Sequence, residues 1–134
     1  MTIGGNGIVT RRSPLLFRAT VSRLEQAASA LGAQLFGRID HAANAKALGK
    51  VLEPTELLMF GRPDVSWPLM RDQRTTALDL PLKILVGRDN EGVVWLRANA
   101  DLMRYPFGYA RESRAEAGAV GADLHLKSPA TGRS

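Results

Sequence analysis

Residues 34–48, which read Gln-Leu-Phe-Gly-Arg-Ile-Asp-His-Ala-Ala-Asn-Ala-Lys-Ala-Leu, join a strand pattern directly to a helix pattern. In the first half the side chains alternate with a period of two, which predicts a strand with two different faces. One face is expected to carry Leu35, Gly37, Ile39 and His41, and the other Phe36, Arg38 and Asp40. Small residues from Ala42 to Leu48 then predict a short helix that ends at Gly49.

The segment before this junction predicts a strand and a longer helix. Residues 1–7 read as a loose leader and residues 8–12 as a first strand. Ser13 is a good N-cap and Pro14 fits the first helical position, so we expect the helix to open there. Gly32 supplies its stop. The spacing of the apolar residues is that of one amphipathic stripe, formed by Phe17, Val21, Leu24, Ala28 and Leu31.

The segment after the junction predicts three further strands. Pro54 marks a turn, and residues 55–60 read as a strand buried on both faces. Residues 64–74 read as a helix or helical turn, capped by Asp64 and interrupted by Pro68. A hairpin follows, with strands at 80–88 and 93–97 around a turn at 89–92.

This order of elements, β-α-β-α-β-(α)-β-β, indicates an α+β fold. We expect a two-layer sandwich, in which helices lie on one face of a mainly antiparallel sheet. Residues 8–100 are expected to form a single domain. Residues 101–134 are rich in small residues and arginine, so we expect a weakly ordered C-terminal extension.

Composition narrows the class of protein. The chain has 134 residues and no cysteine, which excludes disulfides, thiol catalysis and cysteine-ligated metals. No apolar run approaches the ~20 residues of a membrane span. The first residues lack the basic and apolar parts of a secretion signal. We therefore expect a cytoplasmic protein without a membrane partner.

Arginine dominates the positive charge. The net charge is +5, and residues 1–38 carry five arginines against the single acid Glu25. A basic balance raises the question of nucleic acid. However, no basic run is longer than Arg11-Arg12, and no aromatic residues are interleaved with basic ones as a stacking platform requires. A nucleic-acid partner is therefore not expected.

Asp40 and His41 are the adjacent residues best suited to chemistry, because the free pKa of histidine lies nearest neutrality. Neighbours on a strand point to opposite faces, so the two side chains are not expected to pair directly. If the strand ends between them, Asp40 is expected to cap the following helix. His41 then either faces a pocket as a ligand contact or general base, or is a structural histidine.

No complete catalytic or cofactor signature surrounds these residues. The chain has two histidines and no His-x-x-x-His or Asp-x-Asp-x-Asp spacing, so we expect no metal site. Neither a Gly-x-Ser-x-Gly elbow nor a phosphate-binding glycine loop is present, and no cofactor is expected.

The second face of the predicted sheet offers cations. Alternation is expected to align Phe36, Arg38 and Asp40 with Lys83 and Leu85 on this face. Such a face must be covered, and a second protomer is one explanation. The other is a cleft for a small anionic ligand oriented by Arg38 and Lys83. The two can coexist at a dimer interface.

Three blocks in this order carry a family resemblance. They are Phe36-Gly-Arg-Ile-Asp-His-Ala-Ala-Asn-Ala45, Leu52-Glu-Pro-Thr-Glu-Leu-Leu-Met-Phe-Gly-Arg-Pro63 and Ala77-Leu-Asp-Leu-Pro-Leu-Lys-Ile-Leu-Val86. Over roughly residues 8–100 the chain resembles the domain-of-unknown-function family 302, although Arg62 stands where that family usually has Asn. The resemblance implies a small sandwich similar to the TATA-box-binding protein and a homodimer, but no established activity.

We therefore expect a homodimeric domain that binds a small molecule or a partner and has no established catalysis. Arg38, Asp40, His41 and Lys83 are the candidate ligand-binding residues. The alternative is a small enzyme of the hydrolase or lyase class, with His41 as the catalytic acid or base. In that case Arg38 or Lys83 holds an anionic substrate.

Overall fold

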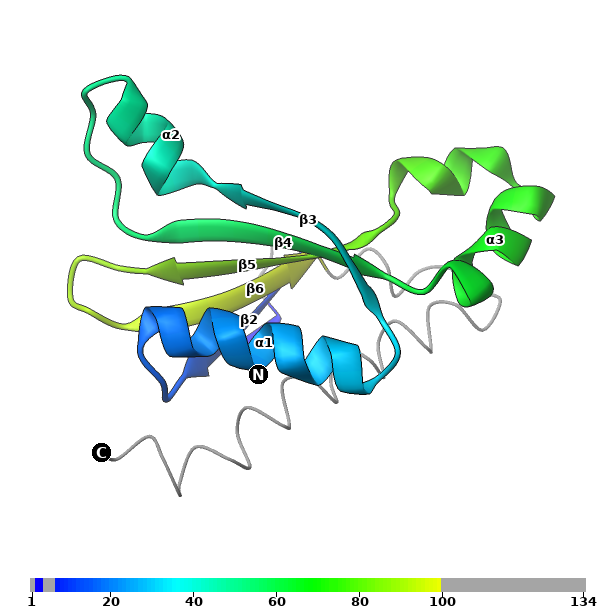
Figure 1. Cartoon of the computed structure of the whole chain (residues 1–134), viewed down its shortest axis with the longest axis horizontal. Helices are drawn as coiled ribbons and strands as arrows, with labels where there is room; N and C mark the ends of the chain where they lie inside the picture. Colours follow the sequence, from blue (N-terminus) through cyan, green and yellow to red (C-terminus); the bar gives the residue numbers. More distant parts are fainter. Residues whose placement is uncertain (1, 4–6, 100–134) are drawn as a thin grey trace.

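The computed structural model describes residues 2–3 and 7–99, which form one antiparallel sheet with three α-helices (Figure 1). Its strands are β1 (Thr2–Ile3), β2 (Ile8–Ser13), β3 (Gln34–Asp40), β4 (Thr55–Gly61), β5 (Leu82–Arg88) and β6 (Val94–Asn99). The helices are α1 (Phe17–Ala30), α2 (His41–Ala47) and α3 (Pro63–Asp72), and a 3₁₀ turn, η1 (Arg74–Leu78), follows α3. The expected α+β class is confirmed.

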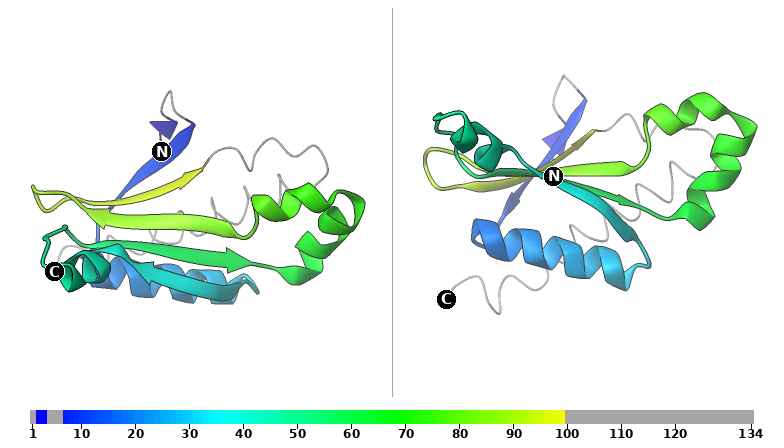
Figure 2. Two further views of the ribbon diagram at one scale, coloured as in Figure 1. Left: turned by 90° about the horizontal axis from the view of Figure 1, so that it is seen from above. Right: turned by 45° about the horizontal axis from the view of Figure 1, so that its top comes forward.

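The sheet has the strand order β1-β2-β6-β5-β4-β3, and every neighbouring pair is antiparallel. Helix α1 lies across one face and forms the second layer (Figure 2). Helices α2 and α3 project from opposite ends of the sheet. The expected leader, residues 1–7, contains a short strand, because Thr2 and Ile3 pair with Thr10 and Val9. The expected extension, 101–134, lies outside the described residues.

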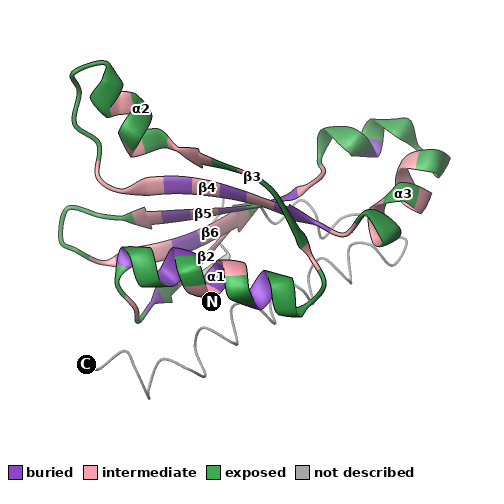
Figure 3. Ribbon diagram, viewed as in Figure 1, coloured by how far each residue is buried: buried purple, intermediate pink, exposed green. Residues whose placement is uncertain are grey.

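The core lies between α1 and the facing side of the sheet. The buried residues of α1 recur at helical spacing, as the amphipathic stripe predicts, although Leu31 at its end is 37% exposed (Figure 3). Burial of this apolar surface supplies the main driving force for folding. The core consists of Phe17, Val21, Leu24, Ala27, Ala28, Leu58, Phe60, Leu82, Ile84, Val86, Val94 and Leu96.

Helix α1 begins later than the sequence suggests. Ser13 does not cap it; instead the Ser13 hydroxyl lies 2.6 Å from the Thr20 hydroxyl and accepts a hydrogen bond from the Leu15 amide. Residues 14–16 therefore form a turn, and the helix starts at Phe17. Its end agrees with the prediction: Gly32 has φ +81°, and the Ala33 amide donates to the Ala28 carbonyl.

Alternation along the strands separates two faces of the sheet. In β4, Glu56, Leu58 and Phe60 are buried against α1, while Leu57 and Met59 are half-buried on the other side. We call this other side the open face, because no helix of the described residues lies across it. By strand register it also carries Ile39, Lys83, Leu85 and Arg97.

Candidate functional site

The junction of β3 and α2 is built as a capped helix start. Asp40 is the N-cap of α2, and its Oδ1 accepts a hydrogen bond of 2.9 Å from the Ala43 amide, so the predicted cap is confirmed. His41 is the first residue of the helix and is exposed. Its side chain makes no hydrogen bond or ion pair with another described residue. Asp40 and His41 therefore do not act as a hydrogen-bonded pair.

A buried carboxylate lies one strand away, and sequence reasoning missed it. Glu56 is opposite Asp40 in the register and is only 2% exposed. Its Oε2 lies 2.9 Å from Arg18 Nη2, and its Oε1 lies 3.5 Å from Arg38 Nε. Arg38 also pairs with Glu25 on α1. In the sequence, the sign of this buried acid was that Glu56 directly precedes Leu57 and Leu58 in a strand whose alternate residues face the core.

The prediction that Arg38 and Lys83 share one face is wrong. Arg38 is opposite Leu58, and Leu58 is opposite Ile84, so this whole row faces α1. Lys83 is opposite Met59 and lies on the open face. The expected and the observed arrangements differ by one residue of register, because a shift of one residue moves every side chain of a strand to the opposite face.

Phe36 and Lys83 occupy different parts of the molecule. The register shifts between Leu35 and Gly37, which sets Phe36 apart from the alternation. The Phe36 ring lies against Gly61, where a Cβ atom would be 2.6 Å from Cε2 of the ring. Lys83 lines a separate hollow of about 340 Å³ on the open face, together with Leu57, Leu85 and Arg97.

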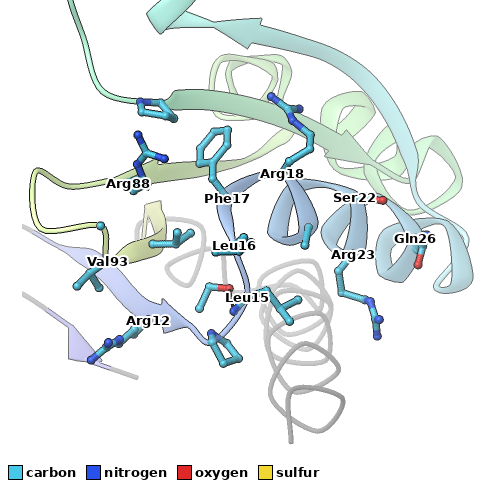
Figure 4. A pocket seen from close by; sticks show the side chains of 16 residues that line it. Arg12, Leu15, Leu16, Phe17, Arg18, Ser22, Arg23, Gln26, Arg88 and Val93 are labelled. Atoms are coloured by element: carbon cyan, nitrogen blue, oxygen red, sulfur yellow. Dashed lines mark hydrogen bonds between the residues drawn. The ribbon is translucent and has the colours of Figure 1, made fainter. Parts of the chain in front are cut away.

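A hollow at the start of α1 carries four arginines (Figure 4). We call it the arginine groove; its volume is about 810 Å³. Its cations come from three elements: Arg12 from β2, Arg18 and Arg23 from α1, and Arg88 from β5. Its apolar wall is formed by Leu15, Leu16, Phe17, Val93 and Val94.

The electrostatics of the arginine groove favour an anion. Among the described residues, no acidic side chain lines it. Arg88 pairs with Glu53 at 3.3 Å, whereas Arg23 has no ion-pair partner among the described residues, and its Nη1 is buried without a hydrogen bond. The N-terminus of α1 opens beside these groups, with no side-chain cap and no acid in its first turn. Such a helix end attracts negative charge.

A second hollow of about 460 Å³ adjoins the groove, because Phe17, Arg18 and Pro54 line both. It lies between α1 and α2 and carries Lys46 and Lys50 beside Asp40. His41 lines neither hollow. Arg18 thus belongs to the groove, to the second hollow and to the ion pair of the buried Glu56.

The described residues contain neither a metal-binding cluster nor a membrane-spanning helix. No group of three His, Cys, Asp or Glu side chains there is placed to hold a metal ion. Within the same part of the chain, no helix has the length and apolar character needed to cross a membrane.

Solved structures support the fold. The chain superposes on the crystal structure of an uncharacterized conserved protein DUF302 from Bacillus stearothermophilus with a TM-score of 0.68. The match covers 90% of this chain and 94% of that chain, at 16% sequence identity. At that identity the likeness establishes the fold alone.

Similar sequences belong to longer proteins. The chain is 43% identical over 94 residues to proteins called fluoride-specific ion channel FluC 1 in Brucella suis biovar 1 (strain 1330) and Brucella abortus biovar 1 (strain 9-941). The match covers 70% of this chain but 37% and 35% of those proteins, so the chain spans little more than a third of their length. The model of the family described as "Domain of unknown function DUF302" matches residues 9–124, which is most of the chain, and the chain therefore belongs to this family.

Proposed function

We propose that this protein is a homodimeric binding domain that takes a small organic anion in the arginine groove. The observation that carries the proposal is the combination, in one hollow, of four arginines, an uncapped helix N-terminus and no carboxylate among the described residues that line it. A volume of about 810 Å³ is within the range of ligand pockets in proteins.

The chemistry of the groove specifies the kind of anion. Guanidinium groups bind phosphate and carboxylate through paired N–H donors. Leu15, Leu16 and Phe17 offer an apolar surface beside them, so the ligand carries an apolar or aromatic part as well as its charge. A phosphate monoester of an aromatic alcohol has both features.

Binding is better supported than catalysis. The described side chains that line the groove are arginine, serine, glutamine and apolar residues, none of which is a general base near neutral pH. His41, the residue with a suitable free pKa, lies outside the groove. The ligand is therefore held rather than converted.

The open face supports the second part of the proposal, a homodimer. Ile39, Leu57, Met59 and Leu85 are half-buried there, and no helix of the described residues covers them. In a two-fold dimer the same patch meets itself, so this apolar centre packs against its own copy. Lys83 and Arg97 then flank the interface.

The Brucella relatives suggest a setting for such a domain. The shared 94 residues are a little over a third of those proteins, whose names describe a fluoride-specific ion channel. We propose that in them the shared region is a separate binding domain. A single fluoride ion does not fill a groove of about 810 Å³, so fluoride is not the ligand expected here.

A calorimetric titration tests the ligand proposal, with phenyl phosphate as the probe and sodium fluoride and phenol as comparison solutes. Wild-type protein is expected to bind phenyl phosphate and neither comparison solute. The double variant Arg12→Gln/Arg23→Gln is expected to bind at least about tenfold more weakly, because charge-assisted hydrogen bonds are lost. Arg74→Gln removes an exposed charge outside the groove and serves as the control. Equal affinity in the double variant would refute the proposal.

Sedimentation velocity tests the dimer independently. Wild-type protein is expected to sediment as a dimer, and Leu85→Glu as a folded monomer, because a charge then lies at the centre of the open face. A wild-type monomer at micromolar concentration would contradict the dimer and leave the ligand proposal standing.

A further inference from the structure

The loop after α2 exposes an unusual amount of apolar surface. Leu48 is 78% exposed, Val51 95% and Leu52 47%. Single exposed apolar residues are common on proteins, but three within one short loop indicate a contact surface. Figure 1 shows α2 and this loop projecting from the end of the sheet, and Figure 3 shows them as mostly exposed. We call residues 46–52 the α2 tip.

The backbone of the α2 tip is held in place. Gly49 has φ +73°, and the Lys50 amide donates to the Ala45 carbonyl at 3.0 Å. The Gly49 amide donates to the Lys46 carbonyl at 2.9 Å. This is the αL turn that closes a helix. The apolar side chains are therefore presented by a hydrogen-bonded turn whose shape is set before any partner arrives.

Cations accompany the apolar residues. Lys46 and Lys50 are exposed on the tip and line the same hollow as Val51 and Leu52. Arg18, whose side chain is 64% exposed, lines it from α1. Of the described residues that line this hollow, Asp40 is the acid, and its Oδ1 accepts a hydrogen bond from the Ala43 amide. The tip thus combines aliphatic side chains with an excess of positive charge.

We propose that the α2 tip docks on the surface of an anionic lipid bilayer. Aliphatic groups enter the boundary between headgroups and acyl chains, while the lysines remain among the anionic headgroups. A protein partner fits less well, because Lys is depleted at protein interfaces and Leu and Val are under-represented among their energetic hot spots. The contact does not span the membrane, and it revises the expectation of no membrane partner, which rested on the missing span.

Co-sedimentation of the full chain with lipid vesicles tests this inference. One set of vesicles is pure phosphatidylcholine, and the other contains phosphatidylglycerol as well. Binding is expected to the anionic vesicles only and to weaken at high salt. Leu48→Ser/Val51→Ser is expected to bind at least about tenfold more weakly, because this variant lacks the two aliphatic side chains that binding transfers from water into the bilayer. Lys46→Gln/Lys50→Gln is expected to bind the anionic vesicles more weakly, by roughly fivefold for each lysine removed.

Matched variants separate the outcomes. Leu78 is 83% exposed on η1, which follows α3, so Leu78→Ser removes an exposed leucine at the other end of the sheet and is expected to bind like wild type. No binding of wild type to anionic vesicles at low salt would overturn the inference. So would binding that persists in Leu48→Ser/Val51→Ser but is lost in Arg12→Gln/Arg23→Gln, which would place the lipid contact at the arginine groove. A tip variant that instead changes the oligomeric state, without vesicle binding by wild type, would identify a contact between copies.

Discussion

Arg18 Nη2 lies 2.9 Å from Oε2 of Glu56, and the two residues differ sharply in exposure: the Arg18 side chain is 64% exposed and that of Glu56 is 3% exposed. Arg18 therefore connects the buried side of the sheet with the arginine groove that it lines. Because Arg38 approaches the other oxygen of Glu56, the carboxylate has two cations. An anion bound in the groove, as proposed, would share Arg18 with Glu56.

The first prediction concerns the stability of this ion cluster. Arg38→Met is expected to lower the free energy of unfolding by about 1–3 kcal/mol, because the buried carboxylate of Glu56 then loses one of its partners. Urea denaturation followed by circular dichroism measures the change. Arg38→Met/Glu56→Met removes both charges and is expected to recover part of the loss. A neutral effect of Arg38→Met would show that Glu56 does not depend on this cation.

The second prediction concerns His41. His41→Ala is expected to change the free energy of unfolding by less than about 0.5 kcal/mol, because the side chain is exposed and makes no hydrogen bond to another described residue. The affinity for phenyl phosphate is expected to stay at the wild-type value. A large loss of affinity with an intact fold would instead support the enzyme alternative, in which His41 touches the ligand.

The third prediction concerns the cap of α2. Asp40→Ala is expected to weaken α2 by about 1 kcal/mol, because the Ala43 amide loses its acceptor. Asp40→Asn keeps an acceptor and is expected to retain most of this stability. Amide hydrogen exchange at residues 43–47 reports the effect locally. Unchanged exchange in Asp40→Ala would mean that the cap contributes nothing to the helix.

The fourth prediction concerns pH and the β5–β6 turn. The pKa of Asp89 is lowered below 3.8, chiefly by the hydrogen bond from the Val93 amide and next by that from Trp95 Nε1, which lies 3.2 Å from Oδ2. A lowered folded pKa gives stability that is complete above the unfolded value of 3.8 and is lost as the pH falls through the folded pKa.

Trp95 offers a direct measurement of that titration. Its indole N–H resonance is expected to shift as Asp89 is protonated, with a midpoint below 3.8. Asp89→Asn is expected to abolish this shift and to flatten the acid dependence of stability. A midpoint above 3.8 would contradict the hydrogen-bonding arrangement of the turn.

Local patterns were enough to predict most elements. The α1 stripe, the Gly32 stop, the Asp40 cap and the hairpin all follow from signals within a few residues. The start of α1 was not predicted correctly, because the Ser13 hydroxyl bonds to Thr20 inside the helix instead of capping the helix. The N-cap preference considers only the amides of the next three residues and takes no account of a side-chain partner seven residues further on.

The sites were harder to predict, because they depend on register and on contacts distant in sequence. Alternation separates the two faces within each strand, but it does not say which face of β3 matches which face of β5. Only the pairing across β3, β4 and β5 shows that Arg38 and Lys83 lie on opposite faces. The arginine groove joins residues of β2, α1 and β5. Its one signal in the sequence was the excess of arginine over acid in residues 1–38.

An NMR titration of the ¹⁵N-labelled protein with phenyl phosphate tests the central claim most directly. The account predicts saturable shifts of the amides of residues 17–19 and of the Nε–H groups of Arg12 and Arg18. In Arg12→Gln/Arg23→Gln, the shifts of residues 17–19 and of Arg18 Nε–H are expected to need at least about tenfold more phenyl phosphate. Shifts confined to the open face around Lys83, or no saturable shift at all, would contradict the arginine groove as the ligand site.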